Sequence, residues 1–196
     1  MKDSNVADDV TRAAVELFAS RGYANTSVQQ IVEAAGVTKG AMYHYFESKD
    51  DLLFGIYDRL LSLQKARLEE IVGRGGPADE VLRTVCIDVI ETSIDDLAAG
   101  TVFFRSMHML SEPRGQEVTR RRREYHDAFA ELISRGQAEG VWRTDIPTAV
   151  LGAHFFSDVH YLSHWYSPVG PQSKSLVAEQ ITDLFLSALR RSDATP

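Results

Sequence analysis

Apolar residues recur along this chain at the spacing of an α-helix, and the alternation typical of a half-buried strand is nearly absent. The first apolar stripe spans residues 6–18 and ends before Gly22, a residue common just after a helix. The second, TSVQQIVEAAG at residues 26–36, begins with a Thr-Ser pair suited to an N-cap, with a glutamine three residues on as in a capping box. A short third helix begins after Thr38. The N-terminal segment is therefore predicted to hold three helices.

Longer helical patterns fill the rest of the chain, and the breaks GRGGP, SEPRG and SPVGP separate them. The predicted helices cover roughly residues 50–72, 77–99, 101–110, 115–139, 146–166 and 173–191. There are no internal repeats and no low-complexity linker. The pattern predicts an all-α fold of about nine helices.

Composition places the chain among ordinary globular proteins. Of its 196 residues 44% are hydrophobic and 25% charged, so disorder is not expected. The single cysteine, Cys86, excludes an intramolecular disulfide framework and suits a reducing compartment. The first residues lack the basic and apolar regions of a signal peptide, and no apolar run approaches the ~20 residues of a membrane span. We expect a cytoplasmic protein.

The net charge of −7 argues, taken alone, against a nucleic-acid partner. Residues 37–49, VTKGAMYHYFESK, are nevertheless slightly positive, with Lys39 and Lys49 against Glu47. The sequence therefore leaves open a locally basic DNA-binding segment on an otherwise acidic protein. The net charge alone does not decide whether the partner is nucleic acid.

Helical spacing divides the short third helix into two faces. Met42 and Phe46 lie four residues apart and are predicted to face the core. The opposite side carries a cation, a gap where a backbone can approach closely, and two polar-tipped rings: Lys39, Gly40, Tyr43 and His44. A major groove about 12 Å wide admits such a helix, so this helix-turn-helix is predicted to read a DNA duplex.

Three further residues near helix N-termini are candidates for phosphate contacts, namely Thr26, Ser27 and Lys49. The alternative is that Tyr43, His44 and Tyr45 are core and rim residues of a small bundle. That interpretation does not explain all of these residues together. Tyr43 and His44 lie on the side of the helix opposite Met42, and packing against one neighbour does not bury both sides.

The segment AAVELFASRGYANTSVQQIVEAAGVTKGAMYHYFESKDDLL, within residues 10–53, resembles the DNA-binding domain of tetracycline-repressor (TetR) family regulators. The likeness is ungapped and covers the first quarter of the chain. Met42 and Asp51 stand where leucine and glutamate are often seen. The resemblance implies operator contacts by Lys39, Gly40, Tyr43, His44, Tyr45 and Lys49. It also implies a helix-turn-helix domain over residues 1–52 and a ligand-binding and dimerisation domain over residues 53–196.

A short DNA-reading helix makes few contacts, so we expect a homodimer on a near-palindromic operator. The resemblance implies that the protein is a repressor. Apolar stripes on the last helix and on residues 150–162 suit a four-helix interface between subunits. The alternative is that both stripes complete the core of one chain. The predicted interface residues are Val150, Ile181, Leu184, Phe185, Ala188 and Leu189.

The middle helices are rich in bulky side chains, most of them expected to be core. The resemblance implies a cavity for a small-molecule effector among them, whose binding would shift the helix that begins near Ser48 and weaken DNA binding. The candidate ligand-binding residues are Phe104, Met107, His108, Arg121, Arg122, Tyr125, Phe129, Phe155, Asp158, Tyr161 and Trp165.

The motif HWYSPVGP at residues 164–171 resembles a junction in regulators of this family that respond to acyl-coenzyme A thioesters. The arginine run at residues 120–123 would then hold coenzyme phosphates, with a solvated basic helix face as the alternative. The group His154, Asp158, His160 and His164 lacks a clear metal-ligand pattern, so interface or pocket histidines are the preferred interpretation. We expect no metal and no cofactor.

Two other classes of function remain open at this stage. The chain has no Gly-rich phosphate loop, nucleophile elbow or HExxH motif, but scattered His, Asp and Glu leave a helical enzyme conceivable. A helical module that binds a partner protein without DNA is the other alternative. The operator sequence, the effector, the regulated genes and the choice between repressor and activator do not follow from the sequence.

Overall fold

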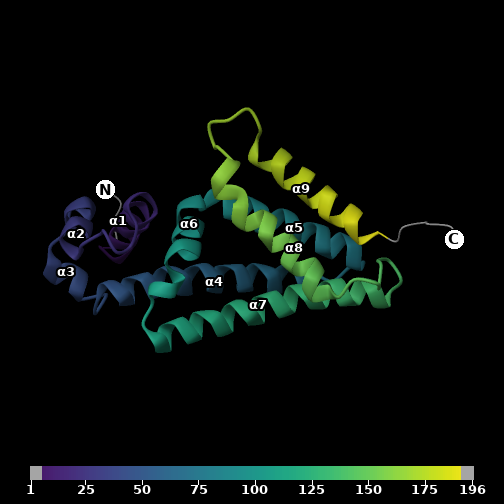
Figure 1. Ribbon diagram of the computed structural model, residues 1–196, viewed down its shortest axis with the longest axis horizontal. Coiled ribbons are helices and arrows are strands. Elements are labelled where there is room, and N and C mark those ends of the chain that lie inside the picture. Colours follow the sequence, from purple (N-terminus) through teal and green to yellow (C-terminus); the bar gives the residue numbers. More distant parts are fainter. Residues whose placement is uncertain (1–5, 191–196) are drawn as a thin grey trace. The chain divides into compact units, whose positions relative to one another are not determined.

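The structure, a computed structural model, describes residues 6–190, which form nine α-helices, one 3-10 turn and no strand (Figure 1). The all-α prediction is confirmed. The helices are α1 (Val6–Arg21), α2 (Val28–Ala35), α3 (Lys39–Tyr43), α4 (Lys49–Gly73), α5 (Ala78–Asp95), α6 (Leu97–Ser106), α7 (Glu112–Ala138), α8 (Thr148–Trp165) and α9 (Lys174–Leu189), with the 3-10 turn η1 (Met107–Met109) before α7.

Two boundaries differ from the predicted ones. The apolar helix predicted over residues 101–110 begins earlier, at Leu97, and its last turn tightens into η1. The long helix predicted from residue 115 already begins at Glu112, so the proline of SEPRG lies in its first turn. Proline is tolerated there because the first turn needs no intrahelical donor from it.

The chain divides into two compact units, each with its own apolar core. Unit 1 combines the residues up to Leu61 with Ala98–Arg120, and unit 2 combines Ser62–Leu97 with the residues from Arg121 on. Helices α4 and α7 therefore each contribute to both units. Helix α4 runs past residue 52 and buries Ile56, Tyr57 and Leu61 in unit 1, so this compact unit includes more of the chain than the segment expected to contact the operator.

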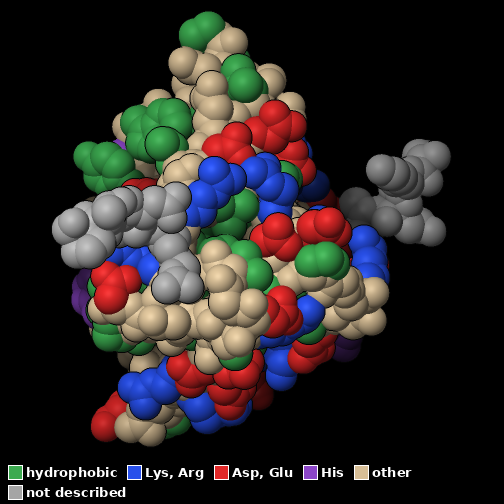
Figure 2. Space-filling view, turned by 90° about the vertical axis from the view of Figure 1, so that its right-hand side faces the viewer, with side chains coloured by type: hydrophobic (Ala, Val, Ile, Leu, Met, Phe, Trp, Pro, Cys, Tyr) green, Lys and Arg blue, Asp and Glu red, His purple; other side chains and the backbone are tan. Residues whose placement is uncertain are grey.

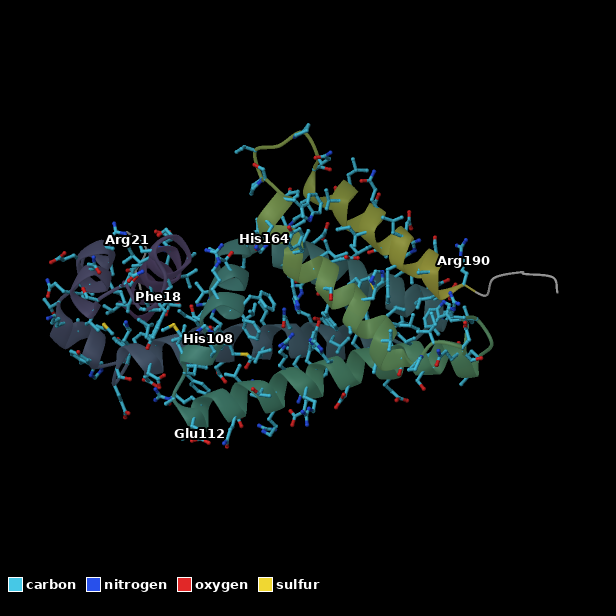
Figure 3. All side chains as sticks on the ribbon, in the orientation of Figure 1. Phe18, Arg21, His108, Glu112, His164 and Arg190 are labelled. Atoms are coloured by element: carbon cyan, nitrogen blue, oxygen red, sulfur yellow. The ribbon has the colours of Figure 1, made fainter. Side chains whose placement is uncertain are left out.

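In unit 1, helices α1, α2 and α3 pack on one another around Phe18, which is labelled on α1 in Figure 3 and is 1% exposed. The buried aromatic ring of Phe18 meets Tyr23 edge-on, with 5.1 Å between ring centroids. Residues of α4, α6 and the start of α7 complete this core, among them Val102, Phe103 and Val118.

In unit 2, helix α9 lies alongside α5 and α8 (Figure 1), and all three pack on one another. Three aromatic side chains from different helices pack against one another in the core: Phe129, Phe155 and Phe185. A search of the described residues for a helix of sufficient length and hydropathy to span a membrane found none.

Candidate functional site

The short helix α3 is fixed at its N-terminal end by local hydrogen bonds. Gly36 ends α2 with φ +68°, a left-handed conformation that favours glycine, and the following amide of Val37 donates to the Val32 carbonyl at 3.0 Å. Thr38 then caps α3, because its Oγ1 accepts from the Ala41 amide at 3.1 Å. The chain thus turns within three residues, and the predicted helix-turn-helix is present.

The two predicted faces of α3 are confirmed. Met42 is completely buried in the core of unit 1, and Phe46 packs against that core from the following turn. On the other side Tyr43 is 50% exposed and Tyr45 49%. The remaining predicted contact residues on this helix, Lys39, Gly40 and His44, are exposed as well. The ring of His44 meets that of Tyr45 edge-on at 5.0 Å, so these two rings support each other on the surface.

Among the described residues, no neighbour requires a glycine at position 40. A Cβ placed on it would meet only the Oγ1 of Thr38, at 3.8 Å, which is an ordinary contact. Its φ is not positive, and alanine is the better helix former by about 1 kcal/mol. The missing side chain therefore leaves a gap on the exposed face of α3, where another molecule can approach the helix backbone closely.

Two of the predicted phosphate contacts are engaged inside unit 1. Thr26 is 1% exposed, and its Oγ1 donates to the Gly22 carbonyl at 2.9 Å, so this hydroxyl closes the connection between α1 and α2 instead of facing solvent. The ammonium of Lys49 donates to the carbonyls of Tyr23 and Thr26, both at 2.9 Å, and lies 4.1 Å from the Tyr23 ring centroid. Its partial burial lowers the pKa of Lys49.

Ser27 is the N-cap of α2 and is exposed. Its Oγ accepts from the Gln30 amide at 3.2 Å, while the Gln30 side chain accepts from the Ser27 amide at 2.8 Å. This reciprocal pair is the predicted capping box. Ser27 is thus presented at the surface beside α3, whereas Thr26 is not.

Sequence reasoning missed a polar cluster at the start of α4, made by Asp50, Asp51, Ser111 and Arg114. Asp50 accepts from the Ser111 amide at 2.9 Å and from the Ser111 hydroxyl at 2.8 Å. Arg114 donates from Nη1 to Asp50 at 2.8 Å and from Nη2 to Asp51 at 2.6 Å. Burial alone would raise the pKa of Asp50, but the hydrogen bonds from Ser111 and Arg114 outweigh it and lower that pKa.

The predicted ligand-binding residues are divided between the two units. Phe104, Met107 and His108 belong to unit 1, and the other eight to unit 2. In unit 2, three of them are part of the solid core, at 4% exposure or less: Tyr125, Phe129 and Phe155. Three others lie on the surface, namely Asp158, Tyr161 and Trp165. These six are thus separated by burial into two groups.

The two arginines have different surroundings. Arg121 donates to the Ser62 hydroxyl at 2.7 Å. Arg122 is half-buried, and this burial lowers its pKa. A partly desolvated guanidinium on α7 is the better candidate for a buried anionic group, because burial strengthens a charge-assisted hydrogen bond.

Two histidines that the sequence did not single out as a pair lie near Arg122. The ring of His126 stacks on Phe156, with 4.1 Å between centroids and 6° between planes, and the His160 ring lies 6.4 Å from that of His126. Burial, followed by the charge of Arg122, lowers the pKa of His126 to about 4 and that of His160 to about 3. Both rings are neutral at pH 7. The signal available in the sequence was the four-residue spacing of Arg122 and His126 on one helix.

A cavity of about 260 Å³ opens on the surface of unit 2, between α4 and α5. Its lining is mostly charged, and a bidentate ion pair between Arg67 and Asp88 closes part of it. None of the predicted ligand-binding residues lines it.

The outer faces of α8 and α9 carry exposed apolar side chains. Leu184 is 73% exposed, Tyr161 60%, Val150 57% and Trp165 50%. Hydrophobic side chains also stand at the upper end of the space-filling view (Figure 2), over the α8–α9 connection, where Val169 is 96% exposed. Ala188 lies on the same outer face of α9 as Leu184, one turn further on.

Two predicted interface residues need correction. Phe185 and Leu189 are 3% and 0% exposed and belong to the core of unit 2, so they are not available to a partner in this structure. Ile181 is half-buried against the same core. The apolar positions of α9 form a band wide enough for two faces, and only its outer half is exposed.

The histidine and aspartate group on α8 is spread over the helix surface. His154, Asp158 and His164 are exposed, while His160 is half-buried. The ring of His164 stacks on Tyr161, with 4.6 Å between centroids. Within residues 6–190 no group of three or more His, Cys, Asp or Glu side chains is placed to hold a metal ion.

The chain is similar to known proteins over most of its length. A family model described as "Bacterial regulatory proteins, tetR family" matches residues 10–56, and one described as "Tetracyclin repressor-like, C-terminal domain" matches residues 75–189. Among curated proteins, the HTH-type transcriptional repressor KstR2 of Mycolicibacterium smegmatis is 26% identical over 94% of this chain and 91% of its own length.

Solved structures of transcriptional regulators are similar to this chain over nearly its whole length as well. A transcriptional regulator of the TetR/AcrR family from Thermobifida fusca is 32% identical over 94% of this chain and 98% of its own, with a TM-score of 0.72. AibR, solved in complex with isovaleryl coenzyme A and operator DNA, is 24% identical over 94% and 98%, with a TM-score of 0.78.

Proposed function

The chain belongs to the tetracycline-repressor family of transcriptional regulators, and from this membership we propose that it represses by binding a near-palindromic operator as a homodimer and is released by an acyl-coenzyme A thioester. Like its family and its relatives, it is a ligand-responsive DNA-binding regulator and not an enzyme. Residues 1–52 are proposed to contain the operator contacts, and residues 53–196 to bind the effector and the partner.

The observation that carries the DNA contact surface is the exposed face of α3, and above all Gly40. No neighbour among residues 6–190 requires a glycine there, whereas the absence of a side chain lets the helix lie deeper in a major groove. Lys39, Tyr43, His44 and Tyr45 surround this gap with one cation and three groups that donate to phosphates or bases. Ser27 adds an exposed hydroxyl at the N-terminus of α2, where phosphate oxygens are favoured. Lys49 is proposed to act from inside, by holding the α1–α2 connection.

The test starts with selection of bound duplexes from a random pool, which supplies an operator. Gly40→Ala should leave the unfolding midpoint unchanged or slightly higher, yet weaken operator binding about tenfold by obstructing the approach. Lys39→Ala and Tyr43→Ala should each weaken it by a similar factor. Lys65→Ala is the matched control, since Lys65 is exposed on α4 outside unit 1. Equal operator affinity of Gly40→Ala and the unchanged chain contradicts the proposed docking face.

The proposed dimer interface is the outer face of α8 and α9, with Val150, Ile181, Leu184 and Ala188 as its residues. Exposed apolar side chains on two neighbouring helices suit the four-helix packing of an isologous interface. Leu184→Glu should convert the dimer into monomers in light scattering and weaken operator binding. Glu179→Gln, on an exposed position of the same helix, is the control. A chain that is already monomeric at micromolar concentration contradicts this interface.

Three observations support an acyl-coenzyme A effector: a sequence motif, a side chain in this structure and a solved structure of the same fold. HWYSPVGP resembles the junction of acyl-CoA-responsive regulators, Arg122 offers a half-buried guanidinium, and AibR, with the same fold, was solved with isovaleryl coenzyme A. Isovaleryl coenzyme A should release the operator, and free coenzyme A should not. Arg122→Gln should abolish release, while Arg123→Gln, the exposed neighbour in the same run, should not. Equal effects of the two variants would favour the solvated basic face.

A further inference from the structure

The connection that follows α3 is held by a carboxylate of α4. The Glu47 amide donates to Oδ2 of Asp51 at 3.0 Å, and the Asp51 amide donates in turn to the Ser48 hydroxyl at 3.0 Å. These two bonds close the turn between Tyr43 and Lys49, which also carries Tyr45. The position of α3, the proposed recognition helix, therefore depends in part on where the Asp51 carboxylate is held.

Arg114 holds that carboxylate. Its guanidinium bridges Asp51 and Asp50 from two nitrogens, and it lies 5.6 Å from the Phe54 ring centroid, which limits its other orientations. The arginine and both aspartates are about three-quarters buried, with side-chain exposures of 26%, 24% and 24%. Charge-assisted bonds of this burial are stronger than ordinary surface pairs, since water screens them less.

The residues that hold Asp50 and Asp51 come from one short stretch around the beginning of α7. In Figure 3 it begins between the labelled His108, in η1, and Glu112, the first residue of α7, and it ends in the first turn of α7. Ser111 binds Asp50 through both its amide and its hydroxyl, so the stretch is attached to α4 by four hydrogen bonds. Movement of the start of α7 must therefore either carry the start of α4 with it or break these bonds.

Helix α7 continues from this attachment into unit 2. Arg114 and Arg121 are seven residues apart on it, which is two turns or about 10 Å. The proposed effector contact Arg122 is the next residue. A helix transmits a displacement of one end to the other over such a length, because its backbone hydrogen bonds resist stretching.

We propose that Arg114 is the positioning residue through which α7 controls the recognition helix: it fixes Asp51, Asp51 fixes the turn after α3, and a displacement of α7 releases that turn. The proposal rests on the proposed function, because it needs operator binding by α3. It adds a contact that touches neither the operator nor the effector. Its chemistry is local, a guanidinium shared between two carboxylates of one helix.

The first test separates positioning from plain stability. Arg114→Gln should weaken operator binding about tenfold or more, and Asp51→Asn should add little to it in the double variant, because both break the same bridge. Arg114→Lys should recover part of the affinity, since an ammonium reaches one carboxylate but not both. Arg59→Gln removes an exposed ion pair to Asp8 within the same unit and is the matched control, expected to bind like the unchanged chain.

The second test uses the coupling in reverse and needs no effector. Coupling between two sites is reciprocal, so operator binding should slow amide hydrogen exchange in the first turns of α7. At saturating duplex this protection should persist in Arg59→Gln and be lost in Arg114→Gln. Equal protection in both variants, or additive losses of affinity from Arg114→Gln and Asp51→Asn, overturns the proposal. If the unchanged chain selects no duplex, the proposed function fails first, and the inference falls with it.

Discussion

The packing of Trp142 on Gly136 supplies a sharp test of the core of unit 2. Gly140, with φ +74°, reverses the chain after α7, and the Val141 amide returns to the Gly136 carbonyl at 2.9 Å. The indole of Trp142 is thereby laid directly on Gly136. A Cβ at that position would lie 2.1 Å from Cε3, 2.2 Å from Cζ3 and 2.7 Å from Cδ2 of the ring.

The expected cost of Gly136→Ala follows from these distances. The ring must move by more than about 1 Å before its carbons reach ordinary contact distance. Trp142 is 3% exposed, so it moves against a filled core, at about 2–3 kcal/mol, the upper part of the range for overpacking, and up to about 5 kcal/mol if the ring leaves its site. Alanine regains about 1 kcal/mol of helix propensity. The net loss should be about 1–4 kcal/mol in the free energy of unfolding.

Urea unfolding followed by circular dichroism measures this loss, and near-ultraviolet dichroism reports whether the indole has moved. Gly100→Ala is the matched control, because Gly100 is also helical but a Cβ there meets nothing within 4 Å. That variant should be stabilised by up to about 1 kcal/mol. The two substitutions therefore have opposite expected signs. A Gly136→Ala protein as stable as the unchanged chain would refute the packing described here.

Two further predictions concern buried polar groups. The pKa of His126 is lowered to about 4, so between pH 6.5 and 4 the unfolded chain binds a proton that the folded chain does not, and stability falls as the pH drops through this window. His126→Phe keeps the stack on Phe156 and should reduce the loss of stability between pH 7 and pH 5 by about 1–2 kcal/mol in urea titrations; equal slopes contradict it. Tyr57→Phe removes a buried hydroxyl that donates to the Val102 carbonyl at 2.9 Å, and should cost about 1–2 kcal/mol without changing the helix content measured by circular dichroism.

The parts of the fold that the sequence predicted well depend on neighbours within about four residues. The cap of α3 at Thr38, the capping box at Ser27 and the opposite faces of Met42 and Tyr43 follow from local spacing alone. Each is decided within one or two turns of helix, so a single sequence suffices to find it.

The parts that were missed depend on residues far apart in the chain. Arg114 meets Asp50 and Asp51 across more than sixty residues, in a stretch that read only as a break between helices. The burial of Phe185 and Leu189 was missed for a related reason. An apolar band on a helix says how much surface is to be buried, but not how much of it the chain covers by itself.

The sharing of α4 and α7 between the two cores, and the place of α6 in the core of unit 1, affect how such regulators can exchange their DNA specificity. Beneath the reading helices, the core of unit 1 includes Val102, Phe103, Leu110 and Val118. A chimera joined at residue 52 would therefore pair these side chains with a foreign partner and leave mismatched packing. A reading head that keeps its own core has to be transplanted together with residues 98–120. Recombination by a single crossover is thus disfavoured, and substitution on the exposed face of α3 is the shorter route to a new operator.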